Sequence, residues 1–279
     1  MKSTDFHAEL DRMYSSLRIL NVPLEKKCKH STSCWRGIVD RMWNDDFEGQ
    51  YDKNEEYEAH LSVPWIGESY DVSKLLVVGI NLYDYGGYWA QRMFVEGAIT
   101  QILDGRRRIK TGNPKYPGTF YWHRIPAYAV AILEKADLMK PIWEDDQFPS
   151  KEDTANAFEF IAMTNSIKCS PKTLPQIKND RSKPTRDMWE NCPRFILREE
   201  IEILKPEKIL IFGNSDNLSY FNKKVLDSPW IWKNYPRTLK GTGKINGRDI
   251  EIFVVPHTSA FGGTSKEIMQ SLIESLNDV

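Results

Sequence analysis

Four short apolar runs, separated by longer stretches of helical pattern, constrain the fold of this chain more than any other feature. The runs are "KLLVVGI" (74–80), "FEFIAM" (158–163), "EKILIFG" (207–213) and "IEIFVV" (250–255). Each is apolar along most of its length, which is typical of strands that are covered on both faces. Helical stretches lie between most of them and after the last, at 124–138, 191–205 and 265–276. This alternation predicts a three-layer α/β/α domain with a central four-stranded parallel sheet.

The first 60 residues have a different character, because they are charged and contain a helical pattern. Apolar residues stand at positions 6, 10, 13, 17 and 20, close to helical spacing. We therefore expect a helical N-terminal segment at 1–60, docked on an α/β domain at 61–279. No run approaches the roughly 18 apolar residues of a membrane span, and "MKSTDFHAEL" lacks the apolar core of a signal peptide. We expect a cytoplasmic monomer that does not contact membranes.

Polar residues follow the predicted strands at the points where the strands end. The runs continue into Gly79-Ile80-Asn81, Thr164-Asn165, Gly213-Asn214 and Pro256-His257-Thr258-Ser259. Ligands of open parallel sheets bind outside the carboxyl ends of the strands, so these residues are expected to line one cleft. We interpret Gly213-Asn214 as a simple turn. The chain contains no P-loop, no Gly-x-Gly-x-x-Gly after the first strand and no His-Glu-x-x-His, which argues against the commonest nucleotide and zinc-protease sites.

The chain has four cysteines: Cys28, Cys34, Cys169 and Cys192. In a reducing cytoplasm this small number argues against disulfides. Two cysteines that are close in sequence and two distant ones can join separate segments around a metal. Four thiolates suit zinc or an iron–sulfur cluster. Four unrelated buried thiols are the alternative interpretation.

The charges are balanced overall but unevenly placed. The formal net charge is −1, so composition alone does not indicate a nucleic-acid partner. Three stretches are basic, at 105–110, 168–186 and 233–244. Any one of them is readily interpreted as a solvated loop. All three together favour contact with nucleic-acid phosphates.

Three motifs in the same order resemble the iron–sulfur (family 4) branch of the uracil-DNA glycosylase superfamily. They are Thr164-Asn165-Ser166-Ile167-Lys168-Cys169-Ser170-Pro171, the segment from Cys192 through "FILREEIEILKPEKILIFG", and His257-Thr258-Ser259. The resemblance covers roughly residues 60–279. The first loop differs from that branch, because Gly79-Ile80-Asn81 is similar to the mismatch-type branch and Tyr83 falls where another branch keeps a tyrosine beside the base. In addition, Cys-x5-Cys replaces Cys-x2-Cys, and the first and last loops both lack the proline of the family.

The resemblance implies a cofactor, a partner and a set of binding residues. By resemblance, the four cysteines hold a 4Fe-4S cluster, for which zinc remains the alternative, and Cys169 anchors the loop in which Asn165 reads the base. The partner is DNA that contains an altered base. The expected base-binding residues are Asn165, Ile80, Tyr83 and Phe120, with Tyr121 as the alternative to Phe120. The expected DNA-binding residues are Lys168, Lys172, Arg181, Arg106, Arg107, Arg108 and Ser259.

The chemistry of N-glycosidic cleavage suggests roles for the remaining polar residues. Cleavage leaves positive charge on the sugar and negative charge on the base, so it needs donors at the base and a held water. We assign His257 as the donor to the leaving base. Asn81 can orient the water, and Asp84, or alternatively Glu68, can take its proton.

These roles describe a monofunctional DNA glycosylase that acts on uracil or another altered pyrimidine. A defence glycosylase that removes a modified phage cytosine, such as glucosylated hydroxymethylcytosine, is an alternative within the same class. A non-catalytic iron–sulfur protein that binds nucleic acid is an alternative from another class, as is a zinc-stapled α/β protein of other function.

Overall fold

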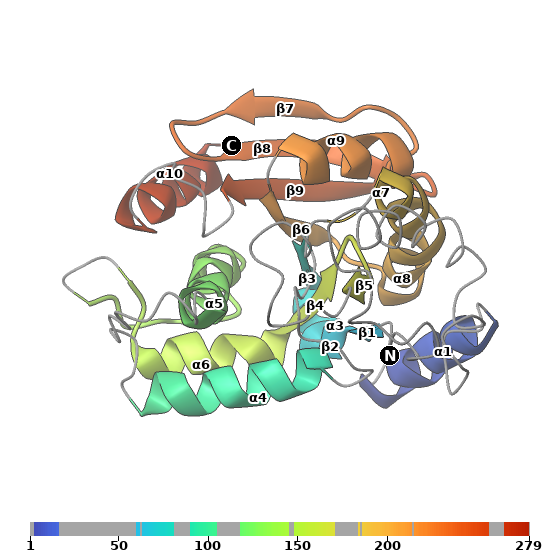
Figure 1. Cartoon of the computed structure of the whole chain (residues 1–279). Coiled ribbons are helices and arrows are strands. Elements are labelled where there is room, and N and C mark those ends of the chain that lie inside the picture. Colours follow the sequence, from blue (N-terminus) through green and yellow to red (C-terminus); the bar gives the residue numbers. More distant parts are fainter. Residues whose placement is uncertain are drawn as a thin grey trace, which may run out of the picture.

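A seven-stranded mixed sheet lies between two layers of helices (Figure 1). The computed structural model describes residues 3–16, 60–61, 63–80, 90–104, 118–144, 148–170, 184, 186–213, 215–256 and 265–278. Across the sheet, the strands follow the order β2 (Trp65–Ile66), β4 (Ile161–Asn165), β3 (Leu75–Gly79), β6 (Lys208–Gly213), β9 (Arg248–Pro256), β8 (Leu239–Ile245) and β7 (Ile231–Asn234). The four inner strands β4, β3, β6 and β9 are parallel. They confirm the predicted parallel sheet, and antiparallel strands extend it at both edges.

The sheet is covered on both faces by the apolar sides of helices, as the mostly apolar runs predict. One core contains Leu76 and Val78 with α1 (Ser3–Ser16), α7 (Arg186–Cys192), α8 (Arg198–Leu204) and α9 (Ser215–Lys224). The other contains Leu75 and Val77 with α4 (Ala90–Leu103), α5 (Gly118–Lys135), α6 (Lys151–Phe160) and α10 (Ser265–Asn277). Successive side chains of a strand point to opposite faces, so each strand supplies both cores. This is the three-layer α/β/α architecture (Figure 1).

The second apolar run, 158–163, is divided between a helix and a strand. Helix α6 starts after Ser150, whose hydroxyl accepts a hydrogen bond from the Asp153 amide at 3.1 Å. The helix continues to Phe160, and the backbone becomes extended at Ile161, where β4 begins. The predicted strand therefore began three residues too early, because Phe158 belongs to the buried face of the helix.

An Asn-Gly pair forms the turn between β8 and β9. Asn246 and Gly247 have φ values of 50° and 73°, the left-handed values that a two-residue hairpin turn requires. The register Ile245↔Arg248 directly flanks this turn. The hairpin uses residues 239–245, most of which belong to the third basic stretch, as an antiparallel strand beside the parallel sheet.

The N-terminal helix belongs to the same core as the sheet. Phe6, Leu10 and Tyr14 of α1 are buried, and the helix packs against α8. Residues 17–59 of the predicted N-terminal segment lie outside the described residues. Two short elements, α3 (Tyr70–Ser73) and the β1 (His60–Leu61) to β5 (Cys169–Ser170) pair, complete the described structure. In the part of the chain that is described, no helix is long and apolar enough to cross a membrane.

Candidate active site

The carboxyl ends of the four parallel strands meet at one edge of the sheet. Gly79 at the end of β3 is in register with Asn165 at the end of β4. Gly213 at the end of β6 is in register with Pro256 at the end of β9. The sequence analysis expected the strand ends to converge, and for the backbone they do. Five predicted site residues follow these ends but lie outside the described residues: Asn81, Tyr83, Asp84, His257 and Ser259.

Asn165 lies in a segment that is held to the end of β3 by backbone hydrogen bonds. The Ser166 amide donates to the Gly79 carbonyl at 2.9 Å, and the Ile167 amide donates to the Ile80 carbonyl at 2.8 Å. Asn165 is only 2% exposed, whereas Ile80 is partly buried and packs against the core. Two of the predicted base-binding residues, Ile80 and Asn165, are thus brought together at the strand ends.

A second contact holds this segment from the side of β6. The Ser166 hydroxyl donates to the side-chain oxygen of Asn217 at 2.5 Å. The Asn217 side-chain nitrogen donates in turn to the Phe212 carbonyl at 3.0 Å. Asn217 is fully buried in α9, so the end of β6 and the segment after β4 are tied through one amide.

Lys168 is buried and paired with Glu200, which corrects its predicted role as a phosphate contact. The Lys168 ammonium lies 2.6 Å from Glu200 Oε2, and the two side chains are 2% and 0% exposed. Burial lowers the pKa of Lys168 from its ordinary value, and the Glu200 carboxylate opposes that shift. A cation in this position neutralises a buried carboxylate and does not reach a DNA backbone.

Glu200 accepts two further hydrogen bonds from other parts of the fold. The Thr164 hydroxyl donates to Oε2 at 2.7 Å, and the Tyr14 hydroxyl donates to Oε1. The Lys168 ammonium also donates to the Thr164 hydroxyl. The network therefore joins the N-terminal helix, the end of β4, the segment before β5 and helix α8.

A π-helical segment, η3 (Pro193–Leu197), connects α7 and α8 directly after Cys192. Pro193 has no amide hydrogen to donate to the preceding turn, and the Arg198 amide bonds to the Pro193 carbonyl five residues back. Buried residues recur every fourth position along this helix: Met188, Cys192, Ile196, Glu200 and Leu204. In a regular α-helix such a row rotates by about 40° per step. The π-helical segment has more residues per turn than an α-helix, which offsets this rotation, so Cys192 and Glu200 both stay on the buried side of the helix.

Two of the predicted metal ligands are close to Lys168, one in sequence and one in space. Cys169 follows it in the chain, and Cys192, which is buried, is close enough that its negative charge raises the lysine pKa against the effect of burial. A neighbouring ammonium favours the thiolate form, which is the form that binds metals. Cys28 and Cys34 lie in the chain between Tyr14 and Leu61. Tyr14 is hydrogen-bonded to Glu200, and Leu61 pairs with Cys169, so the described residues before and after this segment both contact the region around Lys168.

Of the four predicted thiolate ligands, only Cys192 has its side chain among the described residues. Cys28 and Cys34 lie outside them. Within the described ranges, no group of three or more Cys, His, Asp or Glu side chains is arranged to hold a metal. The four-cysteine assignment remains a prediction.

Glu68, the alternative water-activating acid, lies at the wrong end of the sheet. The Gly67 amide donates to the Ile161 carbonyl at 2.9 Å, and the Ser69 amide donates to the Glu159 carbonyl at 2.8 Å. Residues 67–69 therefore lie beside the start of β4, whereas Asn165 is at its end. Glu68 is excluded as a partner of Asn165, which leaves Asp84 as the proposed acid.

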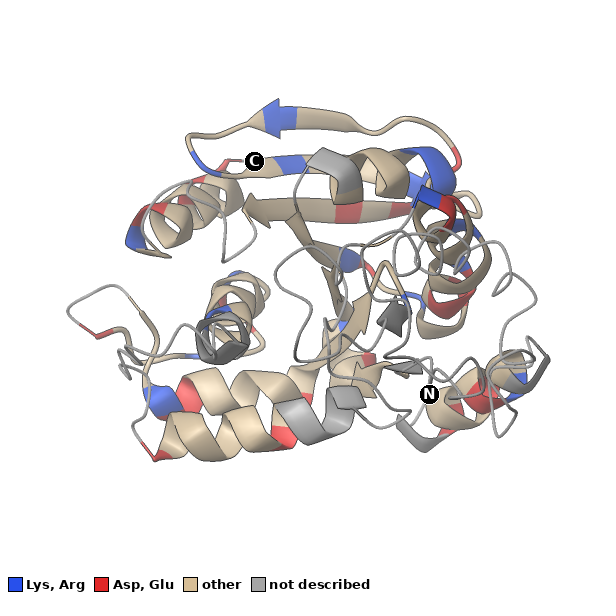
Figure 2. Cartoon of the chain, in the orientation of Figure 1, with Lys and Arg blue, Asp and Glu red and all other residues tan. Residues whose placement is uncertain are grey.

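The third basic stretch is a salt-bridged edge of the sheet. Each of its four cations lies within 4.0 Å of a carboxylate oxygen, in the pairs Lys233–Asp278, Arg237–Glu267, Lys240–Glu251 and Lys244–Asp249. Figure 2 shows acidic and basic residues side by side on β8 and β9. The structure therefore supports a solvated surface for this stretch, and not a patch of unpaired cations.

The other predicted DNA contacts lie in ranges that the structure does not describe: Arg106, Arg107, Arg108, Lys172 and Arg181. Phe120 and Tyr121 fall in the first turn of α5, where the structure gives the backbone path but not the surroundings of their side chains. Their roles as stacking residues and phosphate contacts remain predictions.

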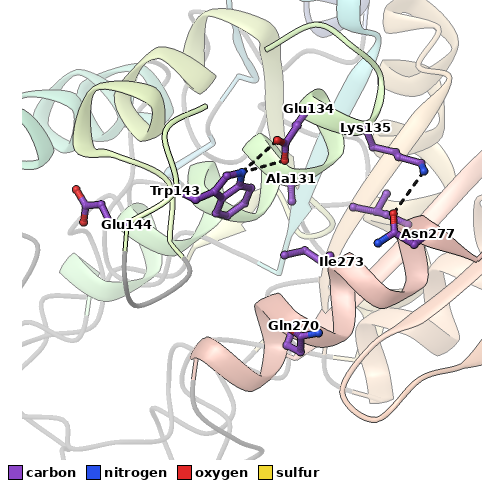
Figure 3. A pocket seen from close by; sticks show the side chains of 9 residues that line it. Ala131, Glu134, Lys135, Trp143, Glu144, Gln270, Ile273 and Asn277 are labelled. Atoms are coloured by element: carbon purple, nitrogen blue, oxygen red, sulfur yellow. Dashed lines mark hydrogen bonds between the residues drawn. The ribbon is translucent and has the colours of Figure 1, made fainter. Parts of the chain in front are cut away.

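A cavity of about 520 Å³ lies between α5, α10 and the segment at 143–144 (Figure 3). The Trp143 indole donates to both carboxylate oxygens of Glu134 at 3.1 Å, and Lys135 donates to Asn277 at 3.4 Å. None of its lining residues belongs to the carboxyl ends of the strands. This cavity is separate from the candidate active site.

Two residues that hold the site, Glu200 and Asn217, were not predicted from the sequence. Glu200 occupies one position of an otherwise apolar row in "FILREEIEILK", and a charge in such a row is a signal for a buried partner. Asn217 lies in α9, three residues after the Asn214 of the predicted turn, and we find no sequence signal that marks it.

The described geometry defines an α/β protein with a polar site at the carboxyl ends of its parallel strands. A family model for the uracil DNA glycosylase superfamily matches residues 70–277. The chain belongs to this superfamily, which supports a DNA glycosylase-type activity. A search of the curated proteins finds no match.

Proposed function

We propose that this protein is a monofunctional DNA glycosylase that hydrolyses the N-glycosidic bond of an altered pyrimidine. The observation that carries the proposal is the convergence of the strand ends at Gly79, Asn165 and Pro256 in a chain of this superfamily. Asn81 follows Gly79 by two residues, and His257 follows Pro256 directly. An everted base at this edge would meet all three loops.

The proposed site contains the groups that glycosidic cleavage needs. The Asn165 amide has both a donor and an acceptor, so it can pair with one edge of a pyrimidine. His257 donates a hydrogen bond to the departing base, where negative charge develops. Asn81 orients a water below the sugar, and Asp84 takes its proton. No covalent nucleophile is required.

DNA binding is proposed to use the arginine run Arg106–Arg108 together with Lys172, Arg181 and Ser259. Cations in such runs neutralise phosphates and do not read sequence. Phe120 is proposed to stack on the everted base, because enzymes that act on a base must take it out of the duplex. Ile80 and Tyr83 complete the proposed pocket.

The four cysteines would hold a 4Fe-4S cluster. When bound, such a cluster supplies a rigid junction between distant segments, and its binding free energy adds to the stability of the fold. Zinc is the alternative metal. A preparation that contains about four irons per chain and is brown favours the cluster.

The substrate is proposed to be uracil or another altered pyrimidine, and a modified cytosine is the second candidate. The first loop permits this second candidate, because Gly79-Ile80-Asn81-Leu82-Tyr83-Asp84 departs from the iron–sulfur branch that the other motifs resemble. A different first loop changes the side chains that contact the ring of the base.

The proposed function is tested by mass analysis of bases released from a panel of duplexes. The panel contains uracil, thymine in a mismatch, hydroxymethylcytosine and glucosylated hydroxymethylcytosine. We expect one free pyrimidine and an abasic strand that stays intact until alkali treatment, because a monofunctional enzyme does not cleave the backbone. Tight DNA binding with no released base from any duplex would instead favour a non-catalytic binding protein.

A further inference from the structure

A buried carboxylate is hydrogen-bonded to both ends of the segment that contains Asn165. Glu200 is 0% exposed, and its Oε2 accepts hydrogen bonds from Thr164 at 2.7 Å and from Lys168 at 2.6 Å. These two residues stand on either side of Asn165 in the chain. One carboxylate oxygen thus closes residues 164–168 into a loop that starts at the end of β4.

The loop is fixed at its remaining positions as well. The amides of Ser166 and Ile167 donate to carbonyls at the end of β3, and the Ser166 hydroxyl donates to Asn217. All five residues from Thr164 to Lys168 are at most 3% exposed. The segment that carries the Asn165 side chain is therefore hydrogen-bonded to β3, α8 and α9.

Stability alone gives a poor explanation for an ion pair at this position. Burying two charges is costly, and apolar residues of similar volume often stabilise a core equally well or better. What apolar residues do not supply is direction, because hydrogen bonds fix the angle as well as the distance of the groups that they join. The network is better explained by the need to hold a side chain in one orientation.

We propose that Glu200 is a positioning residue for base recognition, which acts by holding Thr164 and Lys168 together and thereby orienting the Asn165 amide between them. This inference rests on the proposed function, since it assigns a task to the same site. Asn165 touches the base, whereas Glu200 acts through its neighbours.

Two hydroxyl deletions in one network separate positioning from stability. Thr164→Val removes the donor next to Asn165, and Tyr14→Phe removes the donor from α1 on the opposite oxygen, Oε1. Both variants leave one lone pair of the same buried carboxylate without its donor. A third variant, Glu200→Gln, keeps the size of the side chain and removes its charge. Arg198→Met is the control on the same helix, because it breaks a partly exposed ion pair of 2.6 Å with Asp227.

The decisive readout is the ratio of release rates for the preferred base and its closest competitor in single-turnover assays. A loss of folded protein lowers both rates equally and leaves the ratio unchanged. We expect Thr164→Val and Glu200→Gln to lower the preferred rate by on the order of 10²-fold, because a small misplacement of a positioning group has effects of this size. The ratio should fall by about tenfold or more. Tyr14→Phe and Arg198→Met should leave the ratio at the wild-type value.

A second readout does not depend on activity. Hydrogen exchange of the peptide that covers 164–168 should be faster in Thr164→Val and Glu200→Gln than in wild type, and unchanged in Arg198→Met. If wild type releases no base but exchange follows this order, the proposed function fails while the role of Glu200 in the loop holds. Unchanged ratios and unchanged exchange in folded Thr164→Val and Glu200→Gln would overturn the inference. Equal effects of Tyr14→Phe and Thr164→Val on the ratio would also overturn it.

Discussion

Replacing His257 with alanine should lower the rate of base release by about 10²-fold or more, while DNA affinity stays near the wild-type value. The departing base carries negative charge in the transition state, and a donor aimed at that charge contributes more there than in the bound ground state. His257 follows directly after Pro256, the last residue of β9, at the edge where Asn165 ends β4. Single-turnover release and DNA binding at one salt concentration measure the two quantities separately.

A matched substitution shows whether the effect belongs to this histidine. His7 lies on α1, is partly buried and has no predicted role in the site. His7→Ala should leave the release rate of the folded protein within a factor of about two, because the proposed mechanism does not use this side chain. If His257→Ala released base as fast as wild type, His257 would have no part in the mechanism.

Replacing Cys192 with alanine should remove the iron and the brown colour and should destabilise the fold by roughly 3 kcal/mol or more. Cys192 is buried at the end of α7, beside Lys168 and before the π-helical segment. A four-ligand site that loses one thiolate binds its metal weakly, and the free energy of metal binding is then lost from folding. Iron analysis, visible absorption and thermal unfolding give the three readouts.

Ile196→Val is the control for packing, because Ile196 lies one step further along the same buried row. It removes one buried methyl group and should cost about 1 kcal/mol without changing the iron content. A wild-type preparation that is colourless and free of metal, or a Cys192→Ala protein that keeps all its iron, would contradict the cluster assignment.

The parallel sheet was predictable because its signal is local. Each inner strand contains a mostly apolar run, and burial on both faces requires that pattern whatever the rest of the chain does. The convergence of Gly79, Asn165 and Pro256 then follows from the parallel direction alone. The superfamily match spans the same strands.

The errors come from interactions between residues that are distant in sequence. Lys168 looks like a phosphate contact until Glu200, 32 residues away, is seen to neutralise it. Glu68 looks close to the first loop, but β2 runs antiparallel to β4 and carries Glu68 to the opposite end of the sheet. The position of Glu68 leaves no mark in the local pattern. The charge of Glu200 in an apolar helical row signals a buried partner, but it does not identify that partner as Lys168.

Two features were readable but were missed. The Asn246-Gly247 pair is a strong hairpin signal, and with it the stretch at 233–244 would have been interpreted as a sheet edge instead of a basic loop. The four-residue spacing of buried positions from Met188 to Leu204, with Pro193 inside it, indicated a widened turn. Neither signal is part of the hydrophobic periodicity. The first is the turn type that an Asn-Gly pair favours, and the second is the number of residues per helical turn.

A crystal structure with everted DNA tests the central claim most directly. The duplex carries the base that the panel identifies, on a 2′-fluoro sugar that resists hydrolysis. We predict that the base lies at the carboxyl ends of β4 and β9, within hydrogen-bond distance of the side chains of Asn165 and His257. A base that remains stacked in the duplex, or one that binds in the cavity between α5 and α10, would contradict the account.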